Sequence, residues 1–208
     1  MPRGNPSRAR GRQRRNRRQE AGDRKPARVF RSPAVSPRPL KTARPARVHN
    51  GHPRLRFDPR AVVAVIHLLD AHAGAILGCS PRNPCLSIAG GVSPGELSLA
   101  FLTDAALARL HAEFLGNRSP TDVITFAATP ALGQAGEICV SADAARTFAQ
   151  RHGRDFSAEL TLYLVHGWLH LTGHDDLQPA GKRRMRAAEA RAMALLRAAR
   201  AVPRFRWA

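Results

Sequence analysis

Residues 160–171 form a run that is apolar nearly all the way round a helix and carries two histidines four residues apart, His166 and His170. A helix without a polar face is typical of the middle of a core, so this run predicts a domain built around one buried helix. Residues four apart lie on one helical face, and both imidazoles can therefore point at a single ion. Burying them without partners would be costly, and a bound metal would remove that cost.

The residues after the two histidines favour a turn that leads back toward them. Gly173 can adopt the left-handed conformation that ends a helix, after which His174, Asp175 or Asp176 can supply a third ligand. Two imidazoles with a carboxylate or a third imidazole suit zinc, and three protein ligands leave the fourth position open, as in catalytic sites. Core histidines satisfied by hydrogen bonds are the alternative interpretation.

Two kinds of zinc chemistry are disfavoured by what the motif lacks. Zincin peptidases carry a glutamate general base directly after the first histidine, where this chain has Gly167. Zinc deaminases need a Pro-Cys-x-x-Cys segment, but Cys85 is followed by Leu86, Ser87 and Ile88. The sequence therefore assigns no catalytic acid or base.

The net charge of +19 is concentrated at the N-terminal end. Residues 1–50 hold 16 Lys or Arg against two acids, a balance of +14, and residues 51–208 hold 18 against 13, a balance of +5. This predicts a disordered basic arm over 1–50, able to bind polyphosphates without reading sequence, and a single domain over 51–208. A targeting peptide, or a shorter product that starts at a non-methionine codon such as Val48, is an alternative for the arm.

Hydropathy and cysteine content predict a soluble, cytoplasmic protein without a membrane contact. No apolar run approaches the roughly 18 residues of a membrane span. The three cysteines match neither a disulfide framework nor a cysteine zinc ribbon.

Periodic patterns predict an α+β fold of three-layer α/β/α character, in which a small mixed sheet packs with about five helices. Strands are expected at 96–102, 122–126 and 136–140. Helices are expected at 61–77 after a cap at Asp58, at 104–114 after Thr103, and at 142–151 after Ser141. In the second of these, Leu107, Leu110 and Phe114 are expected to face inward. Two more helices are expected, one from Ser157 through both histidines and one at 179–200. The metal site is thus expected on a central, late helix and the turn that follows it.

Three segments, in order along the chain, resemble one known family. Residues 166–176 agree with the pattern His-Gly-x-Leu-His-Leu-x-Gly-Tyr-Asp-His except at His174 and Asp176. Residues 114–126 are similar to Tyr-Arg-Gly-x-x-x-Pro-Thr-Asp-Val-Leu-Ser-Phe, and residues 136–138 are similar to Gly-Asp-Ile. These are the segments of the YbeY family of endoribonucleases. The resemblance implies one zinc ion per chain, cleavage of single-stranded RNA in the late processing of small-subunit ribosomal RNA, and ribosomal RNA and the small ribosomal subunit as partners in the cytoplasm.

Two departures from the family pattern alter the site that this resemblance implies. The third family histidine falls on Asp176, so the implied ligands are His166, His170 and Asp176, with His174 as a substitute candidate. The family arginine falls on Leu115, so phosphate contacts are assigned to other cations, Arg118, Lys182 and Arg183. A solvated basic face is the ordinary explanation for the last two. A non-catalytic zinc-containing ribosome-assembly or RNA-binding factor, and a metal-dependent hydrolase of another substrate, are the alternative functions.

Overall fold

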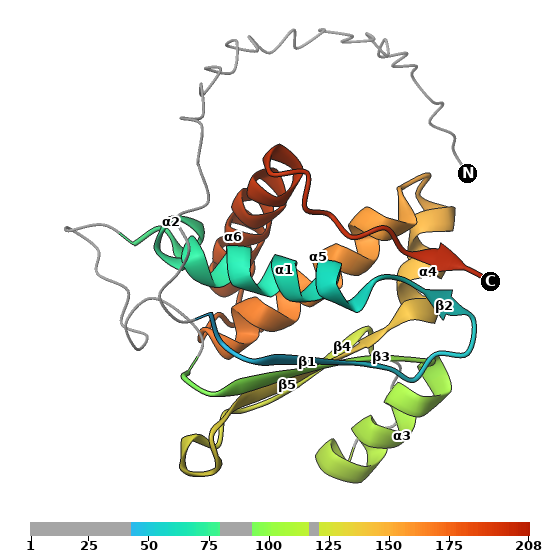
Figure 1. The fold of residues 1–208 in the computed structure, drawn as a ribbon, viewed down its shortest axis with the longest axis horizontal. Coiled ribbons are helices and arrows are strands. Elements are labelled where there is room, and N and C mark those ends of the chain that lie inside the picture. The colour runs from blue at the N-terminus through green and yellow to red at the C-terminus, as the bar shows by residue number, and fades with distance from the viewer. Residues whose placement is uncertain (1–42, 80–92, 117–120) are drawn as a thin grey trace, which may run out of the picture. The chain divides into compact units, whose positions relative to one another are not determined.

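A four-stranded mixed sheet forms the middle layer of the computed structural model, which describes residues 43–79, 93–116 and 121–208 (Figure 1). The strand order is β1-β3-β5-β4. β1 and β5 pair parallel with β3, and β4 pairs antiparallel with β5. The expected mixed sheet is therefore confirmed. The strands are β1 (Ala46–Asn50), β3 (Glu96–Leu102), β4 (Val123–Phe126) and β5 (Gln134–Ser141).

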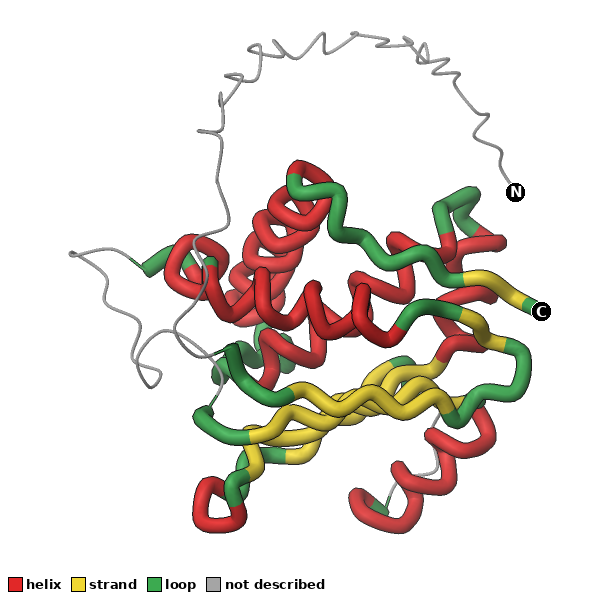
Figure 2. The backbone as a smooth tube through the Cα atoms, in the orientation of Figure 1, coloured by secondary structure: helices red, strands yellow, loops and turns green. Residues whose placement is uncertain are grey.

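Helices cover both faces of this sheet, which confirms the three-layer α+β class (Figures 1 and 2). One face carries most of the helices, and α3 covers the other. A two-stranded antiparallel ribbon, β2 (Leu55–Arg56) with β6 (Arg206–Trp207), lies beside the C-terminal end. The helices are α1 (Pro59–Ala71), α2 (Ala73–Leu77), α3 (Asp104–Leu115), α4 (Ala142–Arg151), α5 (Phe156–Leu171) and α6 (Pro179–Ala198), with a short 3-10 helix at Pro130–Leu132.

The side chains of the central strands divide between two cores, because successive residues of a strand point to opposite faces. Leu99 and Phe101 of β3 belong to the large core under α1, α5 and α6. Ala100 and Cys139 belong to a small cluster under α3, together with Leu107. The expected inward position of Phe114 is wrong, since 59% of this residue is exposed and its ring only contacts Phe126 edge-on.

The apolar helix expected at the centre of the core is α5, nine of whose residues are buried. A Cβ atom at Gly167 would lie 2.5 Å from Cγ2 of Ile138, so the helix backbone packs directly on the sheet. The indole of Trp168 donates from Nε1 to Oδ1 of Asp70 at 3.0 Å, and Arg44 also pairs with Asp70. These contacts fix α5 against the sheet, against α1 and against the residues that precede β1.

The fold begins earlier than the composition indicates. β1, Ala46–Asn50, lies inside the range 1–50 that composition assigns to the basic arm. It is an edge strand with only half-buried and exposed residues. Only Ala46 and Val48 alternate with its polar residues, so the apolar pattern is too short and weak to stand out from the basic arm. The expectation of a disordered arm otherwise falls on residues 1–42, outside the described residues.

Two helix predictions also need correction. The helix expected over 61–77 is divided at His72, where φ is −114° and ψ is 16°, into α1 and α2. Asp155 rather than Ser157 caps α5, by accepting from the amide of Ala158. Ser157 is engaged elsewhere, because its Oγ accepts from the amide of Phe205 at 3.0 Å and lies 3.3 Å from the Phe205 carbonyl.

The hydropathy of the helices and the state of two cysteines can be read from the structure. Within the described ranges, no helix is both long enough and apolar enough to cross a bilayer. Cys79 is disulfide-bonded, although the three cysteines match no disulfide framework in the sequence. Cys139 is a buried free thiol, and burial, reinforced by Glu137, raises its pKa to about 12.

Candidate metal centre

Two imidazoles meet on the C-terminal half of α5. His166 and His170 are one helical turn apart, and their Nε2 atoms lie 2.9 Å from each other. Their ring centroids are 4.5 Å apart and the rings are nearly perpendicular, at 86°. The two side chains keep 23% and 28% of their surface exposed, so the pair sits at the border between core and solvent.

The turn after α5 brings a carboxylate to the same place. The amides of Gly173 and His174 donate to the carbonyls of His170 and Leu169, at 2.9 and 3.0 Å, which is the hydrogen-bond pattern of a Schellman C-cap. Gly173 has φ of 90°, as its expected role requires. Asp176 then reaches back, with Oδ1 3.9 Å from Nε2 of His170.

Ligand atoms of His166, His170 and Asp176 all lie within 4.8 Å of one another. Of the residues that the structure describes, these three form the one such group of three or more histidine, cysteine, aspartate or glutamate side chains. The three residues assigned as metal ligands from the sequence therefore come together in space.

The other nitrogen of each imidazole has an acceptor of its own. Nδ1 of His166 lies 2.7 Å from Oε1 of Glu189, and Nδ1 of His170 lies 3.0 Å from the carbonyl oxygen of His174. A carboxylate and a carbonyl only accept, so both Nδ1 atoms carry the proton. In the neutral rings both Nε2 lone pairs then face each other across 2.9 Å. Either a shared proton or a cation must lie between them.

This arrangement has the features of a transition-metal site. Histidine ligands typically donate their second ring N–H to a carboxylate or carbonyl, which fixes the ring orientation and the tautomer. Two tetrahedral ligands at about 2.0–2.1 Å from zinc lie roughly 3.3 Å apart. The observed separation of 2.9 Å is a few tenths of an ångström shorter. Two nitrogens and a carboxylate oxygen therefore fit zinc with a small movement of the rings.

The charge around the cluster acts on its histidines in opposite directions. Burial lowers the pKa of His166, but the hydrogen bond and charge of Glu189, with the charges of Asp176 and Asp122, outweigh it, and the net pKa is raised above its ordinary value. For His174, burial and then the charges of nearby arginines lower the pKa.

Helix α6 supports the loop that carries Asp176. A Cβ atom at Gly181 would lie 2.2 Å from the carbonyl oxygen of Asp175, so the loop can lie against α6 only because this position is a glycine. Asp175 stabilises the loop by accepting the amide of Leu177 at 2.9 Å. His174 contributes its carbonyl to this architecture, while its Nδ1 lies 3.4 Å from Thr172 Oγ1.

Glu189 is the residue that sequence reasoning missed. It lies on α6, 23 residues from its partner His166, and only the tertiary fold joins them. A signal existed, because Glu189 is four residues from both Met185 and Met193, which are buried. A carboxylate on the apolar stripe of a helix needs a partner.

Gly167 explains physically why the peptidase glutamate is absent. The α-carbon at this position faces the sheet, where even a methyl group would meet Ile138 at 2.5 Å. A glutamate side chain could not be accommodated there. Peptide hydrolysis by a zincin-type base is therefore incompatible with the way α5 packs.

The cations assigned to phosphate contacts remain predictions. Arg118 lies outside the described residues. Lys182 and Arg183 are exposed near the start of α6, a few residues after Asp176. Neither forms an ion pair with a carboxylate of the described part of the chain.

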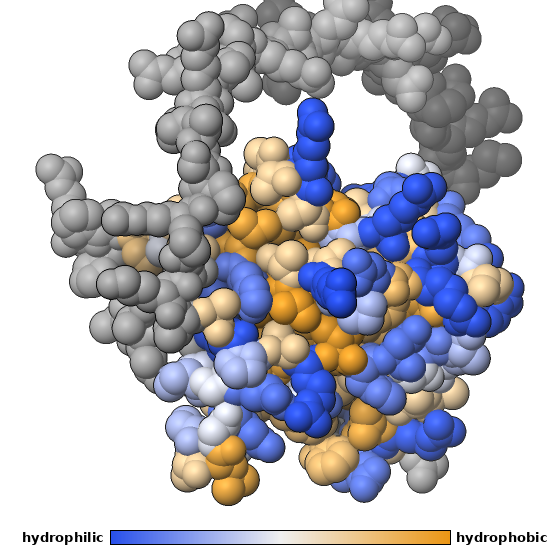
Figure 3. Space-filling model, in the orientation of Figure 1, coloured by the Kyte–Doolittle hydropathy of each residue, from blue (hydrophilic) through white to orange (hydrophobic). Residues whose placement is uncertain are grey.

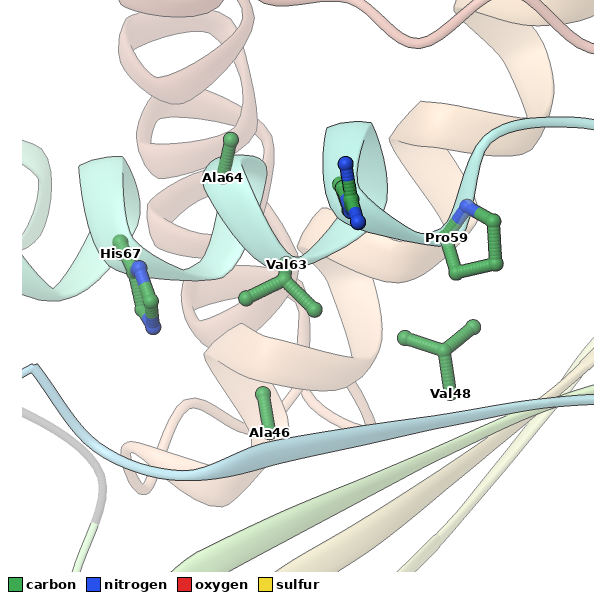
Figure 4. A pocket seen from close by; sticks show the side chains of 7 residues that line it. Ala46, Val48, Pro59, Val63, Ala64 and His67 are labelled. Carbon is green, nitrogen blue, oxygen red and sulfur yellow. The ribbon is translucent and has the colours of Figure 1, made fainter.

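A hollow of about 310 Å³ lies elsewhere, between β1 and α1 (Figure 4). Its walls include Val48, Val63 and His67, and none of the three clustered residues borders it. His67 lies with Nε2 3.1 Å from the carbonyl oxygen of Arg44, which accounts for its polar atom. The candidate metal ligands at the end of α5 are therefore separate from this hollow.

The fold and the clustered side chains define a mixed-sheet protein with a candidate transition-metal site on its central helix. The family model described as Endoribonuclease YbeY matches residues 84–197. The chain belongs to the YbeY family.

Curated relatives named Endoribonuclease YbeY give the extent of the similarity. The Myxococcus xanthus protein is 38% identical over 100 residues, 45% of this chain and 34% of that one. The Rhizobium etli protein is 35% identical over 109 residues, 50% of this chain and 64% of that one. The chain thus spans less than two thirds of the length of either relative.

A more distant relative and a solved structure complete the comparison. The Endoribonuclease YbeY of Parabacteroides distasonis is 33% identical over 106 residues, 51% of this chain and 75% of that one. A solution structure from Thermotoga maritima is 18% identical, with a TM-score of 0.47, and the match covers 75% of this chain and 94% of that one.

Proposed function

We propose that the protein is a zinc-dependent endoribonuclease that cleaves single-stranded RNA in the maturation of small-subunit ribosomal RNA. His166, His170 and Asp176 hold one zinc ion per chain in this proposal. The membership of the family supports the reaction, and the ring contacts support the metal. The observation that carries the proposal is the pair of Nε2 atoms 2.9 Å apart, each on a ring whose Nδ1 is held by an acceptor.

The chain's own groups prepare the site. Glu189 holds the ring of His166, and the carbonyl of His174 holds the ring of His170, so both Nε2 lone pairs are presented with only a small movement of the rings. Asp176 adds a negative charge that offsets that of the ion. When bound, zinc supplies Lewis-acid catalysis by stabilising the negative charge that develops on a phosphodiester.

The basic start of α6 supplies the substrate contact in this proposal. Lys182 and Arg183 are exposed, free of ion pairs with described carboxylates, and follow the Asp176 loop by one to two helical turns. Cations at this position would hold RNA phosphates beside the ion without reading bases. Ribosomal RNA, the small ribosomal subunit as partner, and a cytoplasmic location belong to the same proposal.

The test is cleavage of a single-stranded RNA by zinc-loaded protein, compared with His166→Ala. The wild type should cleave RNA and leave casein intact, and the variant should lose both bound zinc and cleavage. Cleavage of casein would indicate a hydrolase of another substrate. Tight RNA binding without turnover in a zinc-loaded preparation would indicate a non-catalytic RNA-binding factor, and unchanged zinc and cleavage in the variant would overturn the mechanism.

A further inference from the structure

The ribbon of β2 and β6 places two arginines directly opposite each other. In its antiparallel register Arg56 pairs with Arg206, and Leu55 pairs with Trp207. Both arginines are exposed, while Leu55 is fully buried. Like charges at directly opposed positions destabilise a strand pair. The fold therefore accepts an electrostatic cost at this place.

Two more arginines extend the same outward surface. Arg54 lies two residues before Arg56, and Arg204 lies two residues before Arg206, and both are exposed. Arg56, Arg204 and Arg206 border one hollow, and Arg54, which lies in the turn before β2, is placed over the ring of Trp207 at the edge of that hollow. The four are here called the ribbon arginines. None of the four forms an ion pair with an aspartate or glutamate side chain among the described residues. Nε of Arg54 donates to the main-chain oxygen of Ala208 at 2.9 Å.

A hollow of about 630 Å³ opens at this surface, bordered by Arg56, Arg204, Arg206 and Trp207. Asp58 also borders it, but its Oδ1 accepts the amide of Arg60 as the cap of α1. In the view of Figure 3, strongly hydrophilic side chains cover the end of the molecule where Figure 1 labels β2, β6 and the C-terminus.

Aromatic and backbone contacts, rather than carboxylates, hold these cations in place. The guanidinium carbons of Arg146 and Arg54 lie 4.3 and 5.5 Å from the centre of the Trp207 ring. Nη1 of Arg56 donates to the carbonyls of Pro53 and Leu55, at 2.7 and 2.9 Å. A guanidinium held over a ring keeps its in-plane N–H donors for a ligand. These guanidinium groups are thus held in place, and the arginines at the hollow outnumber its one acidic side chain, Asp58.

We infer that the ribbon arginines bind the phosphate backbone of the RNA substrate, as a docking surface separate from the metal centre. This inference rests on the proposed function. Four cations on one short ribbon match a chain of phosphates rather than a single anion, and guanidinium groups suit phosphate oxygens. No base-specific contact is required.

The distance between the ribbon and the metal centre can be spanned by one single-stranded RNA that contacts both. Ser157, in the first turn of α5, is hydrogen-bonded to Phe205, next to Arg206 and Arg204. The ligands His166 and His170 lie nine and thirteen residues further along the same helix. At about 1.5 Å per residue this is roughly 15–20 Å, which about five stacked nucleotides span.

The test compares Arg56→Gln/Arg206→Gln with a control that loses the same charge elsewhere, Arg109→Gln/Arg197→Gln. All proteins are full-length, so any contribution of the basic N-terminal residues is common to them, and the wild type, the ribbon variant and its control are zinc-loaded. Fluorescence anisotropy measures binding of a labelled, 2′-O-methylated single-stranded RNA, which resists cleavage, across a series of salt concentrations.

The expected result is a smaller salt dependence in the ribbon variant. Each lost phosphate contact reduces the slope of log K against log salt by about 0.7 for single strands, so two lost contacts reduce it by about 1.4. At about 0.1 M salt this corresponds to roughly 25-fold weaker binding if the curves meet near 1 M. The control pair should keep the wild-type slope.

Thermal stability, rescue by lysine and cleavage kinetics separate docking from a structural role and from the proposed function. The ribbon variant should be more stable to heat than the wild type, because the opposed charges are gone. Arg56→Lys/Arg206→Lys, which keeps both charges, should restore most of the salt dependence of RNA binding. Arg56→Gln/Arg206→Gln should cleave unmodified RNA with a raised KM and an unchanged kcat. His166→Ala should show the reverse, with wild-type RNA binding and no cleavage.

The inference is overturned if the ribbon variant binds RNA with the slope and affinity of the control pair. It is also overturned if the ribbon variant keeps RNA binding but loses binding to phosphatidylserine vesicles, since the surface would then serve a membrane. Absence of RNA cleavage in the wild type, with the expected slope change intact, would remove the proposed reaction and leave RNA docking standing.

Discussion

Glu189 should control how tightly the site binds zinc, although it is not among the clustered ligands. Its Oε1 lies 2.7 Å from Nδ1 of His166, and the two side chains are only 19% and 23% exposed. A charge-assisted hydrogen bond in such a place contributes about 1.5–3 kcal/mol. Loss of such an outer partner typically weakens metal binding about 10–100-fold.

Two substitutions divide this effect into its parts. Glu189→Gln keeps an acceptor but removes the charge, so zinc affinity should fall about tenfold, while Glu189→Ala removes both and should approach a 100-fold loss. Glu113→Gln is the matched control, because it removes one exposed carboxylate from α3 on the other face of the sheet. Its zinc affinity should stay within about twofold of the wild type.

The assay is competition for zinc with a chelating dye at about pH 8, where ordinary imidazoles are neutral. In the zinc-free protein, NMR titration of His166 should also show a lower pKa in Glu189→Gln, since the charge of Glu189 helps to raise that pKa. The reasoning is refuted if Glu189→Gln and Glu113→Gln bind zinc equally well, or if the pKa of His166 does not fall.

Three further predictions follow from the site and its helix. Gly167→Ala should lower the free energy of unfolding by up to about 2 kcal/mol, since overpacking of about 1–3 kcal/mol outweighs the helix-propensity gain of about 1 kcal/mol. Gly74→Ala, whose added Cβ would have nothing within 4 Å, should not lower it, and an equal loss for both variants in urea unfolding would contradict this packing argument. Asp176→Ala should weaken zinc binding by more than about 100-fold and His174→Ala by less than about tenfold, and equal losses in the same dye competition would contradict the ligand set. Zinc affinity should fall as pH falls through the raised pKa of His166, so the loss of affinity begins above the ordinary value of 6.5. The folding stability of the zinc-free protein should change in the opposite direction, because the raised pKa of His166 stabilises the fold below pH 6.5 and this stabilisation is lost as pH rises. Calorimetry with and without zinc measures both effects.

Local signals were sufficient for most of the helices and strands. The caps at Asp58, Thr103 and Ser141 each accept the expected backbone amide, because capping depends on residues only two or three positions apart. The strand expected at 96–102 is β3 with the same bounds. The left-handed Gly173 and the return of Asp176 also follow from local chemistry.

Features that depend on distant partners were not predictable in this way. β1 is stabilised chiefly by its parallel pairing with β3, some fifty residues away, because its own sequence offers only the short apolar pattern of Ala46 and Val48. Ser157 was expected to cap α5, but the Phe205 backbone occupies its hydroxyl. Glu189 reaches His166 only once α6 has packed beside α5. In each case the structure depends on a contact between residues that are distant in sequence, and patterns over a few neighbouring residues do not reveal such a contact.

The central claim is that the end of α5 and the turn after it hold one zinc ion. Elemental analysis combined with zinc X-ray absorption on the purified protein tests this most directly. The account predicts one zinc per chain, with two histidine nitrogens at about 2.0–2.1 Å and a carboxylate oxygen, and loss of the metal in His166→Ala and in Asp176→Ala. Protein without stoichiometric metal, or zinc retained in both variants, would contradict it.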